Sequence, residues 1–74
     1  MGDDLLKLEE KARLPREDAA ARLHAIADEL ASGNGVVFEQ DGRRYVAKTP
    51  AEVRMKLELE VEDDETEFEI KLSW

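Results

Sequence analysis

The chain is short, acidic and free of cysteine, and these properties exclude several classes of protein. Its 74 residues suffice for one domain, which without Cys has no disulfide, no thiolate nucleophile and no cysteine zinc site. Nineteen acidic and 11 basic residues give a net charge of -8, which disfavours direct binding to nucleic acid or anionic lipid. The sequence shows neither a signal peptide nor an apolar run of the roughly 20 residues that span a bilayer. We therefore expect a cytoplasmic protein without a membrane partner.

The first dozen residues fit two different patterns. Leu5, Leu8 and Ala12 have the spacing of one helix face. Leu6, Leu8, Ala12 and Leu14 have the even spacing of a strand. The pattern alone leaves both structures open.

Residues Pro15 to Ser32 form the clearest predicted helix. Apolar residues recur every three or four positions on one face, namely Ala19, Leu23, Ile26, Ala27 and Leu30. Pro15 suits a first helical position, Glu17 and Asp18 suit the positive end of the helix dipole, and Gly33 suits the position after the last turn. The helix is therefore predicted to end at Ser32.

A β-hairpin is predicted from Val36 to Lys48. Its turn is Asp41-Gly42, a dipeptide that accepts the positive φ angles of a two-residue hairpin loop. This turn fixes the register, in which the predicted facing pairs are Val36 with Ala47, Val37 with Val46, Phe38 with Tyr45, and Glu39 with Arg44. Pro50 interrupts any ladder beyond this hairpin.

A second hairpin is predicted from Glu52 to Trp74, because apolar and charged residues alternate along it almost without exception. With Glu62 to Glu65 as the turn, all apolar residues fall on one face. The predicted facing pairs are Val61 with Thr66, Leu59 with Phe68, Leu57 with Ile70, Met55 with Leu72, and Val53 with Trp74.

The order of these features resembles the amphi-Trp domain family, small uncharacterised proteins and modules of archaea and bacteria. The resemblance is carried by the helix start Pro15-Arg-Glu-Asp-Ala-Ala-Ala21, by Leu23, Ala27 and Leu30, and by the charged amphipathic strand pair that ends in Trp74. Family members often place Ser or Thr at the helix cap, whereas Leu14-Pro15 offers no side-chain acceptor here.

The resemblance favours a strand for Leu5 to Arg13. The predicted fold is thus α+β, in the order β-α-β-β-β-β, with one amphipathic helix covering the apolar face of an antiparallel sheet. The chain forms one domain over residues 1–74, with a strand at 5–13, the helix at 15–32, and hairpins at 36–48 and 52–74. The family offers no catalytic or ligand-binding residue to transfer.

The outer face of the second hairpin is the candidate partner-binding surface. The register places Glu60 opposite Glu67 and Glu58 opposite Glu69, and like charges facing each other destabilise a sheet. Such a face can prefer a cationic partner. It can also be a charged surface that prevents aggregation.

Trp74 has two readings, since it can close the core opposite Val53 or anchor another subunit. No catalytic, cofactor-binding or metal-ligating residue stands out. His24 is the only histidine, Ser32 and Ser73 lack a triad context, and Asp63-Asp64-Glu65 lacks the ligand spacing of a calcium loop.

We therefore expect a non-catalytic interaction module without a cofactor, which binds a protein partner, or itself as a homodimer, through the sheet. One alternative is an acidic nucleic-acid mimic that occupies a nucleic-acid-binding protein. Another is a small-ligand or metal-binding domain. The composition does not distinguish these alternatives.

Overall fold

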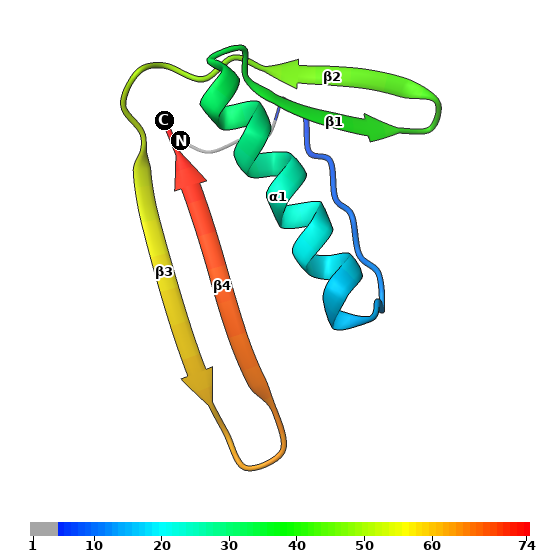
Figure 1. Ribbon diagram of the computed structural model, residues 1–74, viewed down its shortest axis with the longest axis vertical. Helices are drawn as coiled ribbons and strands as arrows, with labels where there is room; N and C mark the ends of the chain where they lie inside the picture. Colours follow the sequence, from blue (N-terminus) through cyan, green and yellow to red (C-terminus); the bar gives the residue numbers. More distant parts are fainter. Residues whose placement is uncertain (1–4) are drawn as a thin grey trace.

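The computed structural model describes residues 5–74 and contains one helix followed by four strands (Figure 1). The elements are α1 (Arg16–Ser32), β1 (Val36–Gln40), β2 (Arg43–Ala47), β3 (Arg54–Val61) and β4 (Thr66–Ser73). Two antiparallel two-stranded sheets result, β1–β2 and β3–β4. The predicted α+β class with a single helix is confirmed.

Both ends of α1 follow from the local sequence. Pro15 is the N-cap and not the first helical residue, because its ψ of 149° is extended, so the predicted start is one residue too early. No side chain caps this end, and the Pro15 carbonyl accepts the backbone N–H groups of Asp18 at 3.0 Å and Ala19 at 3.1 Å. At the other end Gly33 has φ 81°, as a left-handed cap requires, and its N–H donates to the Leu30 carbonyl at 3.2 Å.

The β1–β2 hairpin has the predicted turn and register. Asp41 and Gly42 have φ angles of 56° and 74°, both positive, as the two-residue turn requires. All four predicted pairs are present, and the ladder also includes Gln40 with Arg43. Gly35 precedes this hairpin with φ 134°, and a Cβ atom there would collide with the Ala47 carbonyl. Only glycine therefore fits at position 35, directly before β1.

The β3–β4 hairpin also has the predicted register, from Val61 with Thr66 to Met55 with Leu72. The Glu62 N–H donates to the Glu65 carbonyl at 2.8 Å and closes the four-residue turn. The ladder ends at Arg54 with Ser73, so the predicted pair of Val53 and Trp74 lies beyond it.

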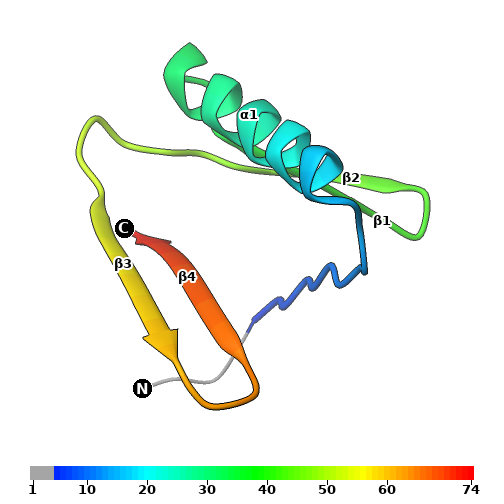
Figure 2. The same ribbon diagram turned by 60° about the horizontal axis from the view of Figure 1, so that its bottom comes forward.

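The predicted strand from Leu5 to Arg13 is wrong. Residues 6–15 have no regular secondary structure, and Figure 2 shows this segment leading away from the start of α1. Arg22 on the helix donates two hydrogen bonds to the Glu10 carboxylate, at 3.1 and 3.3 Å, and thereby fixes this segment to the helix. Even spacing of apolar residues is insufficient for a strand, because a strand also needs a ladder partner, and none of the described strands pairs with this segment.

The predicted packing of α1 on an antiparallel sheet is confirmed for β1–β2, but β3–β4 is a separate sheet that α1 does not cover. Among the described elements, α1 packs against β1, and no helix or other strand packs against the β3–β4 hairpin. The half-buried Glu29 joins α1 to β1, because its carboxylate accepts the Val37 N–H at 3.0 Å. Figure 2 shows α1 lying over β1–β2, with the β3–β4 hairpin standing apart. Helix and first hairpin therefore form one unit, and the second hairpin another.

The molecule is open for its size. Its radius of gyration is 14.2 Å, whereas a compact chain of this length has a value of about 11 Å. Its accessible surface is 7030 Å², whereas a folded monomer of this mass exposes about 4,600 Å². No hydrophobic side chain of the described residues is buried. The best-shielded apolar side chains are only half-buried, and they lie on α1, on the first hairpin, in the segment before α1 and at the end of β4, namely Ile26, Leu30, Val36, Val37, Phe38, Tyr45, Leu8 and Leu72.

Candidate interaction surface of the second hairpin

The pairing of β3 with β4 sorts their side chains onto two faces of opposite character. Directly paired residues lie on the same face of an antiparallel sheet. The acidic face consists of Glu58, Glu60, Glu67 and Glu69. The apolar face consists of Met55, Leu57, Leu59, Val61, Phe68, Ile70 and Leu72, with Thr66 beside the turn. The structure thus brings together the four carboxylates that the sequence predicts to be neighbours.

Like charges face each other along the acidic side of the hairpin. Glu58 pairs with Glu69 and Glu60 with Glu67, and these four side chains line a shallow hollow of about 120 Å³. At the next position Lys56 faces Lys71. Each facing pair of like charges costs about 0.2 to 1 kcal/mol of stability in a sheet. These facing like charges therefore lower the stability of the hairpin.

One ion pair relieves this repulsion among the described residues of the hairpin. The Lys56 Nζ lies 3.4 Å from the Glu58 Oε1, along the same strand, and both side chains are more than half exposed. Lys56 pairs in this way with Glu58 of its own strand and not with Glu69 diagonally across the ladder. An exposed pair of this kind contributes little. The net charge of the face stays negative, so the face attracts cations.

The apolar face is open to solvent. Six of its apolar side chains are between 43 and 70 % exposed, the most exposed being Val61 near the turn, whereas Leu72 at the other end is half-buried. No described helix or strand lies against them. A contiguous apolar surface of this kind is typical of an interaction site.

Trp74 lies at the end of the second hairpin, where it meets the first. It lines an apolar hollow of about 470 Å³ together with Leu8, Val36, Phe38 and Tyr45. Its side chain remains 48 % exposed. Trp74 is therefore placed next to β1 and β2, where it can join the two hairpins and still contact another molecule.

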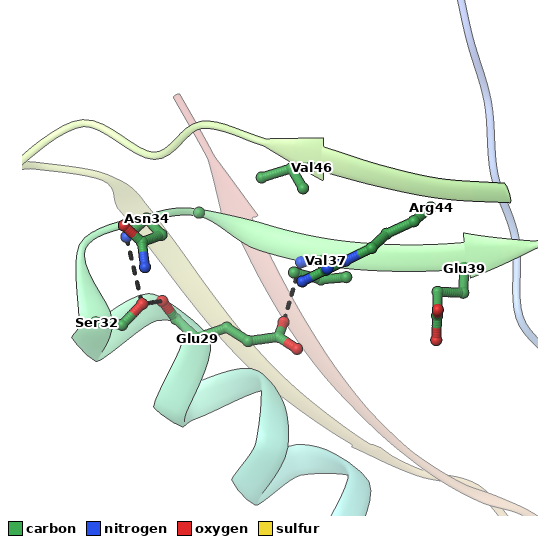
Figure 3. Close-up of a pocket in the computed structure, with 8 residues that line it drawn as sticks. Glu29, Ser32, Asn34, Val37, Glu39, Arg44 and Val46 are labelled. Atoms are coloured by element: carbon green, nitrogen blue, oxygen red, sulfur yellow. Dashed lines mark hydrogen bonds between the residues drawn. The ribbon is translucent and has the colours of Figure 1, made fainter.

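A second hollow, of about 440 Å³ and more polar, lies between the end of α1 and the first hairpin (Figure 3). Here Glu29 accepts the Val37 N–H, the Ser32 hydroxyl donates to the Glu29 carbonyl at 2.7 Å, and the Asn34 N–H donates to the Ser32 Oγ at 3.3 Å. Arg44, opposite Glu39 in the ladder, reaches toward Val37. Sequence reasoning missed Glu29, although a carboxylate in the last turns of a helix with no basic residue there was a usable signal. Its contacts fasten the helix to the hairpin.

The remaining candidates are dispersed. His24 is exposed on α1 and lies with Ala20, Leu23 and Ala27 along the helix surface. Across residues 5–74, no group of three or more His, Cys, Asp or Glu side chains is arranged to hold a metal ion. Within the same residues, no helix has the length and apolar character needed to cross a bilayer.

Comparison with known families gives one finding. The sequence model of the Amphi-Trp domain matches residues 1–74, the whole chain. Comparisons with curated proteins and with solved structures give no match.

Proposed function

We propose that this chain, which belongs to the Amphi-Trp domain family, is a cytoplasmic, non-catalytic protein-interaction module that acts through its β3–β4 hairpin. One observation supports this proposal above the others. Except at its C-terminal end, where Trp74 lies next to β1 and β2, the hairpin stands apart from the other described elements and exposes one acidic face and one apolar face, each formed by a regular register. Such a two-faced sheet presents a surface for recognition, whereas catalysis needs a pocket that excludes water.

The partner of the acidic face is a basic protein surface. Four carboxylates face one another in two pairs, and a cationic partner would remove their mutual repulsion on binding. Part of the stability that the hairpin loses in isolation would then be regained in the complex. This binding should weaken with salt, because exposed charges are screened within about 8 Å at physiological ionic strength.

The test is capture of proteins from extract by the tagged chain at low and high salt. The face variant replaces Glu58, Glu60, Glu67 and Glu69 by Gln. The control variant replaces Glu9, Glu52, Glu62 and Glu65 by Gln, all exposed and outside the strands. Both changes remove four negative charges from the net charge of -8, so both variants carry -4. The comparison therefore isolates the position of the charges from their number.

We expect the wild type and the control variant to retain the same basic proteins at low salt, and the face variant to lose them. High salt should release them from all three. Equal capture by the face variant and the control variant would contradict the proposal. Release of the captured proteins by added DNA would identify the acidic face as a mimic that occupies nucleic-acid-binding sites.

A further inference from the structure

We infer that the apolar face of the β3–β4 hairpin is covered by the same face of a second copy of this chain. This inference rests on the proposed function, since both assign recognition to this hairpin, but it concerns the opposite face. Met55, Leu57, Leu59, Val61, Phe68 and Ile70 form the contact, and the two acidic faces point outward. The dimer is a two-layered sheet sandwich built from two hairpins.

The chain exposes more surface than a folded monomer leaves open. The excess is about 2,400 Å² over the whole chain, and permanent homodimers bury roughly 2,000 to 5,000 Å² in total. The exposed apolar face of β3–β4 is part of this excess, and a second copy would cover it.

The apolar face of the β3–β4 hairpin also needs a partner that is always bound. An isolated two-stranded hairpin is at best marginally stable in water, and three or more strands or a packed helix are needed to support it. Neither α1 nor the first hairpin packs against β3–β4 among the described elements. A transient partner would leave the hairpin unsupported for much of the time. A second copy is always present in equal amount and supplies two more strands.

The chemistry of the face favours a copy of itself over a different protein. Every one of its six contact side chains is apolar, so the face has no charge with which to select a complementary partner. A two-fold contact places the same patch on both sides and needs only self-complementary shape. The charges lie on the opposite face of each hairpin, where the sandwich keeps them in water and apart from each other.

The first test is the mass of the purified chain in solution, measured by light scattering during size exclusion. We expect twice the chain mass of 8.4 kDa. Leu57→Lys places a charge in the centre of the apolar face and should reduce the mass to that of one chain. Glu58→Gln, the adjacent residue on the acidic face, changes the charge equally and should leave the dimer intact.

A second test does not depend on the folding of Leu57→Lys. The chain has no Cys, so a single introduced cysteine reports contact between copies. Packed sheets lie about 10 Å apart, which a short bismaleimide spans and a disulfide does not. We expect Leu59→Cys to form a covalent dimer with this reagent, and Glu60→Cys on the other face to form at least tenfold less.

A wild-type mass of one chain at high concentration would overturn the inference and indicate that the hairpin closes on α1 within one molecule. Equal crosslinking of the two cysteine variants would overturn it as well, because contact would then be random. Both tests use the purified chain alone. A failure of the dimer inference can therefore be told apart from a failure of the acidic face to bind a basic partner.

Discussion

At the scale of single residues, Glu10 and Arg22 form the clearest electrostatic contact of the chain. The hydrogen bonds from the Arg22 guanidinium, together with its positive charge, lower the pKa of Glu10 below its ordinary value of 4.5. The same contact raises the pKa of Arg22. A carboxyl with a lowered pKa binds fewer protons in the folded state than in the unfolded state. It therefore stabilises the fold above its ordinary pKa, and this contribution is lost as the pH falls.

Removal of this carboxyl should reduce the acid sensitivity of the fold. We expect the free energy of unfolding of Glu10→Gln to fall less steeply than that of the wild type between about pH 5 and pH 3. Urea denaturation at several pH values measures this slope. Glu9→Gln removes the same charge from the adjacent residue and should retain the wild-type slope. Identical slopes for Glu10→Gln and the wild type would show that the contact with Arg22 does not form in solution.

At the scale of elements, the β3–β4 hairpin should become more stable when its like charges are removed. Glu60→Lys places opposite charges at the pair with Glu67. We expect a gain of about 0.2 to 1 kcal/mol in the free energy of unfolding at low salt, and a smaller gain at high salt. Chemical denaturation at two salt concentrations measures both.

Two controls separate facing charge from total charge in this experiment. Glu60→Gln removes the repulsion without adding an attraction, so its gain should be intermediate. Glu62→Lys makes the same change of charge in the turn, outside β3, where no residue of β4 pairs with it. If Glu62→Lys raised the free energy of unfolding as much as Glu60→Lys, the effect would come from net charge alone.

Local elements are predictable from this sequence because each is determined by residues that lie close together in the chain. Alternating residues on both sides of Asp41-Gly42 are enough to set the first register, and Gly33 is enough to end α1. The four Glu of the acidic face follow from the second register in the same way. These predictions rest on periodicity and turn chemistry, both of which can be read from a single sequence.

The placement of these elements was not predictable in the same way. The strand expected at residues 5–13 failed because periodicity describes one segment, whereas a strand requires a second one. The contact of Arg22 with Glu10 spans 12 positions, and no periodic pattern in the sequence indicates it. The prediction that α1 covers the whole sheet failed for a related reason. No pattern within either hairpin specifies whether it is covered by α1 or by another chain.

At the scale of the whole molecule, the proposed dimer has a thermodynamic consequence, because no hydrophobic side chain of residues 5–74 is buried within one chain. A dimer that unfolds to separate chains is stabilised by mass action, so its melting temperature rises with concentration. For about 150 residues in two chains we expect a rise of roughly 3 to 5 °C for each tenfold increase. Thermal unfolding followed by circular dichroism over a hundredfold range of concentration measures this. A constant melting temperature would indicate that each chain folds alone.

All packed elements of the described chain are neighbours in the sequence: α1 with β1, β1 with β2, and β3 with β4. Chains with such local contacts fold quickly, because little loop entropy is lost before each contact forms. During synthesis, α1 and the first hairpin can therefore form soon after they leave the ribosome, whereas the second hairpin becomes stable only when its apolar face is covered. In the dimer proposed above, the apolar face is buried only when two chains meet, so its exposed side chains are open to chaperones until then.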